Sequence, residues 1–368
     1  MSPGALKSAY TDRANPTGLI AAKMSETQGW GEGPVTAQMF GNAGREYMDK
    51  YGATSEDFAE IARVNHAHAM ANPYAQSKRA YTLKEVRESQ MLHDPITKLQ
   101  ACPPSSGAGA AVLVNQAWLD QHPDMRSKAV RVAGQAMVTD SPSVYGGSAM
   151  DLVGYDMSSR ATRAAFKEAG RNVRDVGVVE LHDCFSANEM VTLPALGLCE
   201  EGDAHLMVRR GDITYGGRLV VNPSGGLIGK GHPLGATGLA QCAELVWQLR
   251  GWAGEWEAGV GKDVGGQSKE GRERGVKGRQ VEGVKVALQH NLGLGGAAVV
   301  TLYERADGEA AKTLREDEVQ RMSGVGYNPA AEAREVTVED VRKVQSTQNA
   351  SEWAMGGVLE HLKTKARL

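Results

Sequence analysis

Cysteine is scarce in this sequence: the 368 residues contain four, and no two of them form a CxxC pair. Dispersed cysteines argue against a disulfide framework and against a zinc ribbon. A run of 18 apolar residues is also absent, and the first residues lack the apolar core of a secretory signal. We therefore expect a protein of a reducing compartment that neither spans a membrane nor is secreted.

An excess of charge of one sign is missing as well. The chain has 41 basic and 44 acidic residues, for a formal net charge of −3, so we predict no nucleic-acid partner and no anionic membrane surface. No group of histidine, cysteine and carboxylate residues has the spacing of a metal site. His66 and His68 are two residues apart and would point to different faces of a helix, so we predict no bound metal.

The sequence does have enough apolar residues, 41% of the total, for a sizeable buried core. Residues 1 to about 95 combine Gly/Pro breaks with helical patterns at Ala37–Tyr51 and Ser55–Asn72, which predicts a layer of helices and loops. Apolar runs at Ala108–Val114 and Lys128–Met137 predict buried strands.

Strands and helices alternate from about residue 129 to residue 304. The strands are expected at Val130–Ala136, Val176–Leu181, Val284–Gln289 and Ala297–Tyr303, and the helices at Met157–Ala169, Ser186–Leu196 and Leu234–Arg250. This alternation predicts an α/β fold, a mixed sheet with helices on both faces. The segment 251–282 interrupts it with charged, glycine-rich sequence, which predicts a mobile surface insertion.

A first group of reactive side chains, His182, Asp183 and Cys184, comes directly after the expected strand Val176–Leu181. A thiol at a helix N-terminus has its thiolate form favoured by the helix dipole, so Cys184 could act as an acid or base near neutral pH. The alternative interpretation is a buried cysteine beside an aspartate that caps the helix.

A second group is the glycine-rich stretch 222–238, in which six glycines surround His232. Glycine lets the backbone approach a ligand closely. Because proline is well placed in the first turn of a helix, we predict that His232-Pro233 opens one. A histidine held there is placed to take or give a proton. Plain glycine turns would explain some of these residues but not all six.

A third group, residues 289–296, connects two apolar strands and contains Asn291 and Gly293. Taken alone, the pattern favours a glycine-rich hairpin. The functional alternative is a set of exposed backbone N–H groups that hold a developing oxyanion.

Together these groups resemble the thiolase superfamily, and His182–Phe185 with Asn222–Gly226 resembles its sterol-carrier-protein branch. The likeness runs through most of residues 1 to 305. It implies a thiolase-like fold and an enzyme, an acetyl-CoA C-acyltransferase, that joins or cleaves acyl-CoA chains through a cysteine thioester. It also implies no metal or redox cofactor, with coenzyme A as substrate or product.

The resemblance implies a role for each matching residue. His232 would activate the nucleophilic thiol and help to bind the thioester oxygen. His182 would contribute to the oxyanion site for the acyl-CoA enolate, and Cys184 would move the α-proton. Gly293 would supply a backbone N–H to the other oxyanion hole. Asn291 occupies the position where other thiolases carry their second cysteine.

Three further residues belong to the substrate-binding set that the resemblance implies. Cys102 lies near the stretch that resembles the pantetheine-binding segment, and Ser224 and Gly225 lie in the glycine-rich stretch. The family nucleophile sits in an Asn-Cys-(Ala/Ser)-(Thr/Ser)-Gly-like loop, which these 368 residues do not contain. Cys199 and Cys242 match parts of the fold that are not nucleophilic. We therefore expect no thiolysis from the chain as it stands.

The resemblance divides the chain into three regions. Residues 1–128 are expected to be what remains of the N-terminal thiolase half with its loop domain, so that the N-terminal layer is incomplete and an apolar face is exposed. Residues 129–305 are expected to form the C-terminal thiolase domain, and residues 306–368 a polar tail. The tail ends in Ala366-Arg367-Leu368, which is similar to the Ser-Lys-Leu import tripeptide. We therefore expect a peroxisomal protein, bound by the import receptor and homodimeric like its family.

Two functions remain open from sequence. The first is 3-oxoacyl-CoA thiolysis in peroxisomal β-oxidation and lipid metabolism, with acyl-CoA as the substrate. The second is a non-catalytic acyl-CoA- or lipid-binding protein, or a partner of a full-length thiolase.

Overall fold

The computed structural model describes residues 16–254, 278–335, 337–339 and 342. Residues up to Ala331 form one unit and those from Glu332 a second, and the elements below belong to the first. Most of the predicted insertion 251–282 and the whole C-terminal tripeptide lie outside the described residues, and the predicted three-region division stays a prediction. None of the described helices is both long and apolar enough to cross a membrane.

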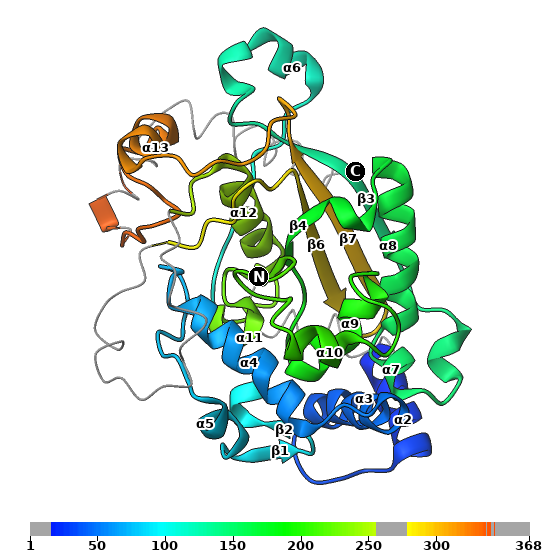
Figure 1. Cartoon of the computed structure of the whole chain (residues 1–368). Coiled ribbons are helices and arrows are strands. Elements are labelled where there is room, and N and C mark those ends of the chain that lie inside the picture. Colours follow the sequence, from blue (N-terminus) through cyan, green and yellow to red (C-terminus); the bar gives the residue numbers. More distant parts are fainter. Residues whose placement is uncertain (1–15, 255–277, 336, 340–341, 343–368) are drawn as a thin grey trace, which may run out of the picture. The chain divides into compact units, whose positions relative to one another are not determined.

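A five-stranded mixed sheet with the strand order β3-β7-β6-β4-β5 organises the first unit (Figure 1). β4 runs parallel to β5 and to β6, and β7 runs antiparallel to β6 and to β3. Its strands are β3 (Val130–Val138), β4 (Val176–Glu180), β5 (Val220–Val221), β6 (Val286–Gly293) and β7 (Ala297–Arg305). The expected α/β class and its four strands in residues 129–304 are confirmed.

The helices precede, cover, connect or follow these strands. They are α2 (Pro16–Gln28), α3 (Val35–Tyr51), α4 (Ser55–Ala69), α5 (Leu83–Arg87), α6 (Gln116–Gln121), α7 (Ala149–Leu152), α8 (Tyr155–Ala169), α9 (Ser186–Ala195), α10 (Ala204–Arg209), α11 (Gly226–Lys230), α12 (Thr237–Arg250) and α13 (Glu316–Ser323). A small antiparallel pair, β1 (Met91–His93) and β2 (Ile96–Thr97), lies beside α3. The N-terminal part is thus mainly helical, as the sequence predicts.

Successive side chains of a strand point to opposite faces of a sheet, and helices cover both faces of the central strands here. The edge strand β3, predicted to be buried, is partly exposed, with Met137 70% exposed. Leu288 and Val300 belong to the main core, which includes α8 and α9. Their neighbours on the other face, Ala287 and Tyr303, pack with Leu245 of α12. Figure 1 shows α8 along β3 and β7, and α12 over the strands on the other side. The predicted coverage of both faces is confirmed.

Local sequence explains where the two long N-terminal helices begin and end. Asp57 accepts a hydrogen bond from the backbone N–H of Thr54 over 2.7 Å and closes a capping box at the start of α4. Gly52 follows α3 with φ at 75°, the left-handed conformation in which a helix ends most easily at glycine. These two signals place both helices within three residues of their predicted limits.

One predicted strand is wrong, and one predicted helix begins later than expected. The segment Ala108–Val114 is not a strand, since it has no regular secondary structure, and Val112 and Leu113 are 91% and 84% exposed. A strand needs a neighbour that accepts its backbone hydrogen bonds, and the described part of the chain places none beside it. The helix expected from Leu234 begins at Thr237, because Pro233 forms a turn in which its carbonyl accepts the Thr237 N–H over 2.9 Å.

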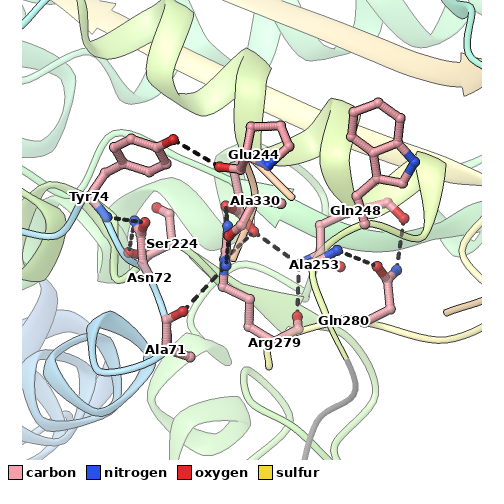
Figure 2. A network of polar contacts seen from close by, with 12 residues as sticks. Ala71, Asn72, Tyr74, Ser224, Glu244, Gln248, Ala253, Arg279, Gln280 and Ala330 are labelled. Carbon is pink, nitrogen blue, oxygen red and sulfur yellow. Dashed lines mark hydrogen bonds and ion pairs between the residues drawn. The ribbon is translucent and has the colours of Figure 1, made fainter. Parts of the chain in front are cut away.

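A buried arginine ties α12 to segments that are distant in sequence (Figure 2). Arg279 is 1% exposed and forms a bidentate ion pair with Glu244 of α12, with Nη2 2.8 Å from Oε2. Its guanidinium also donates to the carbonyl oxygens of Ala330 over 2.7 Å and Ala71 over 3.3 Å. Gln248 of α12 donates to the Arg279 carbonyl over 2.8 Å. These contacts hold the C-terminal half of α12 in place.

Replacing Glu244 with Gln should destabilise the fold by about 3–5 kcal/mol, because it leaves the Arg279 charge buried without a counter-charge. The measurement is the free energy of unfolding in urea for the variant and the native chain. Asp317→Asn is the matched control, since its partners Arg315 and Arg321 are 81% and 68% exposed and an exposed pair contributes less than about 1 kcal/mol. Equal effects of the two substitutions would contradict the prediction.

Candidate functional site

The three groups of residues singled out in the sequence meet at one edge of the large sheet. β4, β5 and β6 are parallel neighbours, so their carboxyl ends lie together. His182 and Cys184 follow β4, the glycine-rich stretch follows β5, and Asn291 lies near the end of β6. The fold therefore brings together side chains that are more than 100 residues apart.

Two histidines form the centre of this site. The rings of His182 and His232 are 4.9 Å apart between centroids and nearly perpendicular, at 88°. His232 lies between α11 and α12, and its backbone N–H donates to the Ser105 hydroxyl over 3.0 Å. The neighbouring Pro104 forms a parallel bridge with His232. The segment before residue 106 thus holds the second histidine against the first.

The hydrogen bonds of Thr237 identify the neutral tautomer of His232. The Thr237 hydroxyl donates to the carbonyl of Pro233 over 3.1 Å, and His232 Nδ1 lies 2.7 Å from the same hydroxyl oxygen. Because the hydroxyl hydrogen is used, this oxygen accepts from Nδ1–H. The other ring nitrogen, Nε2, then carries the lone pair and can accept a proton.

Both imidazoles are neutral at neutral pH. Burial, and next the positive charge of Lys230, lowers the pKa of His232 to about 4. Burial first, then the charges of His232, His290 and Lys230, lowers the pKa of His182 well below its usual value. His182 Nδ1 is buried and has no hydrogen-bond partner among the described residues. One unused ring nitrogen therefore remains in the centre of the site.

Cys184 and Cys102 are neighbours at an isolated antiparallel bridge. Ala101 pairs with Phe185 in an antiparallel bridge, and the Cys102 N–H donates to the Cys184 carbonyl over 2.9 Å. Cys102 therefore lies beside the site as a neighbour of Cys184, and its predicted contact with substrate stays a prediction. Burial raises the pKa of Cys102 to about 12, and the neighbouring Asp183 adds to this rise.

The expectation that the helix dipole favours a Cys184 thiolate is wrong. The residue is 7% exposed, and burial, then Cys102 and Asp183, raises its pKa well above the usual value. The loss of hydration outweighs the dipole of α9, so the thiol stays protonated. The alternative of a buried cysteine is confirmed, although Asp183 caps a different helix from the one expected.

Asp183 caps α11 instead of α9. Its carboxylate accepts the N–H groups of Leu227 over 2.7 Å and Ile228 over 3.3 Å, and Asn65 of α4 donates to it over 2.9 Å. A Cβ on Gly226 would lie 2.2 Å from this carboxylate. The glycine therefore lets the start of α11 reach Asp183.

Ser224 and Gly225 hold the glycine-rich loop in place. The backbone N–H and the hydroxyl of Ser224 donate to Glu180 over 2.9 and 2.8 Å. Gly225 has φ at 94°, and a Cβ there would lie 2.5 Å from the Cβ of Ala69. Ser224 is buried with its hydroxyl engaged. The predicted contact of these two residues with substrate stays a prediction.

A third buried carboxyl group, that of Glu189 on α9, joins α4 to the same loop. It accepts from Asn65 over 2.8 Å and from Asn222 over 3.0 Å. Burial raises the pKa of Glu180 to about 8 and that of Asp183 to about 7, and raises the pKa of Glu189 well above its usual value. The group therefore carries fewer negative charges at neutral pH than its three acids suggest.

Residues near the end of β6 form hydrogen bonds with the backbone of His182 and with the neighbouring helices. The His182 N–H donates to His290 Nδ1 over 3.5 Å, and His290 Nε2 lies 2.9 Å from the Ser158 hydroxyl of α8. Asn291 donates to Gln241 of α12 over 2.6 Å. The glycine-rich hairpin between β6 and β7 is confirmed. The oxyanion role of Gly293, the exposed last residue of β6, stays a prediction.

Sequence reasoning missed five residues of this site: Asn65, Glu180, Glu189, Lys230 and His290. Glu180 could have been found as a charged residue that ends an apolar strand, and Lys230 as the one cation in the glycine-rich stretch. Asn65 and Glu189 lie in helices and carry no local pattern. Among the described residues no three His, Cys, Asp or Glu side chains are grouped to hold a metal ion.

Comparisons with known proteins point to one superfamily. Residues 143–268 match the family model described as "Thiolase C-terminal domain-like". The chain is 50% identical over 303 residues to sterol carrier protein 2 of Bos taurus, covering 82% of this chain and 51% of the relative. It is 34% identical over 296 residues to an acetyl-CoA acetyltransferase of Methanothermobacter thermautotrophicus, covering 80% of this chain and 70% of the relative.

The fold itself has a solved counterpart. The structure of the Ltp2-ChsH2(DUF35) aldolase superposes with a TM-score of 0.57 and 21% identity, covering 81% of this chain and 70% of the other. At this identity the likeness concerns the fold alone. The chain spans about half the length of the bovine relative.

The raised pKa of Cys184 predicts slow alkylation. We expect that iodoacetamide modifies this thiol at a rate with no inflection between pH 6 and pH 9, because the thiolate forms only above that range. The rate is measured by mass spectrometry of the peptide that contains Cys184. Denatured protein is the control, where an ordinary cysteine pKa of about 8.5 should reappear. An inflection below pH 8 in the folded chain would refute the assignment.

Proposed function

The chain belongs to the thiolase superfamily, in its sterol-carrier-protein branch, and from this premise we propose that its site binds acyl-CoA thioesters and is the acid/base half of a 3-oxoacyl-CoA thiolase. One observation carries the proposal: a pair of neutral histidines, His182 and His232, lies at the end of β4, where the protonated thiol of Cys184 also lies. This combination suits proton transfer next to a thioester carbonyl.

The structure suggests how these groups divide the work. His232 Nε2 can accept a proton from an attacking thiol, because its Nδ1–H is already bound to Thr237. His182 can place its ring beside the oxygen on which enolate charge develops. Cys184, protonated at neutral pH, can return a proton to the α-carbon of that enolate. Each step uses a group in the protonation state in which the fold holds it.

A hollow beside His232 could receive part of the ligand. It measures about 380 Å³ and is lined by Ser105, Gly107, Gly109, Pro233, Leu234 and Leu239, with others. Small residues and backbone dominate its wall, which suits a narrow, partly polar chain such as pantetheine. We place the pantetheine arm of the acyl-CoA here.

Claisen chemistry of this type also needs a nucleophilic thiol, and none of the four cysteines of the chain supplies one. Burial raises the pKa of Cys102 and of Cys199 to about 12. Cys242 lies on α12, packed against the second core cluster. We propose that a polypeptide of these 368 residues binds acyl-CoA but does not catalyse thiolysis by itself.

A second function is favoured by the exposed apolar segment that contains Val112 and Leu113. Exposed apolar side chains mark surfaces that bind other molecules. The chain could therefore be a non-catalytic acyl-CoA- or lipid-binding protein, or a partner of a full-length thiolase. In either case, the tripeptide Ala366-Arg367-Leu368 supports import into peroxisomes and a role in β-oxidation there, and membership of the family supports a homodimer.

Acyl-CoA binding and its dependence on the histidines of the site separate these functions. Titration calorimetry with acetyl-CoA should show saturable binding, while acetoacetyl-CoA with free coenzyme A should show no turnover. His182→Ala should weaken the binding by about 1 kcal/mol, or roughly fivefold, because a hydrogen bond from its ring N–H to the thioester carbonyl oxygen is lost.

The matched control for this titration is His122→Ala, which changes a histidine outside the site. Robust turnover by the native chain would refute the proposed dependence on another thiol. Equal affinity of the native and the His182→Ala chains would favour the non-catalytic alternative. Absence of acetyl-CoA binding would refute the first function and the acyl-CoA-binding form of the second.

A further inference from the structure

A loop between α4 and α5 binds the backbone just before His232. The N–H of Gln76 donates to the carbonyl oxygen of Lys230 over 3.0 Å. The N–H of the next residue, Ser77, donates to the carbonyl oxygen of Gly229 over 3.1 Å. These two hydrogen bonds attach the end of α11 to the N-terminal, helical part of the chain.

The side chain of Gln76 also binds the segment before residue 106. Its Nε2 donates to the carbonyl oxygen of Pro104 over 3.2 Å, and its Oε1 accepts from the Ser105 hydroxyl. Because a carbonyl oxygen can only accept, the amide nitrogen must face Pro104, which leaves the amide oxygen to face Ser105. Gln76 therefore joins this segment to the end of α11.

The Ser105 hydroxyl acts on His232 as an acceptor. Its single hydrogen can go to Gln76 Oε1 or to the carbonyl oxygen of Pro103, 3.0 Å away, and neither of these oxygens can donate. In either case the hydroxyl hydrogen is used, so the oxygen accepts the backbone N–H of His232 over 3.0 Å. Thr237 accepts the ring Nδ1–H for the same reason. Two hydroxyl groups thus hold His232, one at its backbone and one at its ring.

Gly231 allows the two residues to come this close to the backbone before His232. It has φ at 105°, and a Cβ there would lie 2.7 Å from Ser105 Oγ and 2.9 Å from Gln76 Oε1. His232 lies between α11 and α12 and belongs to neither. Because no helical hydrogen bond holds its backbone, the contact with Ser105 is needed to fix its conformation.

We propose that Gln76 and Ser105 are positioning residues for His232: together they fix its backbone, so that the ring Nδ1–H stays on Thr237 and Nε2 stays free to accept a proton. The importance of this orientation for catalysis rests on the proposed acyl-CoA function, whereas the orientation itself does not. Ser105 also lines the hollow of about 380 Å³ beside His232. The hydroxyl that orients the histidine therefore borders the space in which we place the pantetheine arm.

The test is the tautomer of His232, measured by NMR of the ring nitrogens at neutral pH in the full chain labelled with ¹⁵N, without ligand. The signals of His232 are identified by their loss in His232→Gln. The native chain should carry the proton on Nδ1. Ser105→Ala and Gln76→Leu should each lower the ratio of the Nδ1–H form to the Nε2–H form roughly fivefold, the change expected when one hydrogen bond is lost.

Two further variants serve as controls. Ser105→Thr keeps the hydroxyl group and should keep the native ratio. Ser106→Ala changes an exposed neighbour and should also leave the ratio unchanged. A shifted ratio in Ser105→Ala and Gln76→Leu, with the native ratio in both controls, supports the proposal, because a purely structural role would not change the tautomer of the ring.

The remaining outcomes overturn the proposal or separate it from the proposed function. An unchanged ratio in either folded test variant overturns it, as does an equal shift in Ser106→Ala. If one test variant fails to fold, the other decides. If neither folds, Gln76 and Ser105 serve the stability of the fold and the proposal is overturned. Failure of acetyl-CoA to bind the native chain would refute the proposed function but leave the tautomer result intact.

Discussion

Carboxyl groups buried at the end of β4 require hydrogen-bond donors, because an unpaired buried carboxylate costs several kcal/mol. Glu180, Asp183 and Glu189 obtain these donors from the loop after β5, from the start of α11 and from Asn65 of α4. Satisfying the acids therefore fixes the glycine-rich loop, and with it the position of the histidine that follows α11. The buried carboxyl groups form their hydrogen bonds within the protein and so hold the site in place. The polar groups that would contact a ligand are not used for this purpose.

The glycines of the loop allow close contacts of the backbone, and the burial of the site determines which of its side chains are charged. Gly225 and Gly226 leave no room for a Cβ against Ala69 and Asp183, so close approach of the backbone is what makes the hydrogen bonds possible. Burial then favours the uncharged forms, raising the pKa of the thiol of Cys184 and lowering that of the imidazoles. The site consists of neutral donors and acceptors, which suits a ligand whose charge develops only during reaction.

Periodicity and turn residues predicted the sheet strands and the long helices, because those elements are determined by local patterns and by burial on both faces. The failures have nonlocal causes. Ala108–Val114 has the pattern of a strand but lacks a neighbour to pair with, and pairing is not encoded in the segment. The sequence alone predicted the effect of the helix dipole on Cys184, whereas the loss of hydration that outweighs it depends on tertiary packing. Asn65 became part of the site only through tertiary contact, whereas the likeness to a family motif predicted one site for His182 and His232, and their ring centroids are 4.9 Å apart.

The most direct test of this account is a crystal structure of the chain with bound acetyl-CoA. The account predicts that the thioester carbonyl oxygen lies within about 3.2 Å, hydrogen-bond distance, of a ring nitrogen of His182, with the pantetheine arm beside Pro233. Binding of the ligand at the opposite end of the sheet would contradict the account. A larger cavity of about 770 Å³, lined by Gly177, Arg218 and Lys285 among others, lies there.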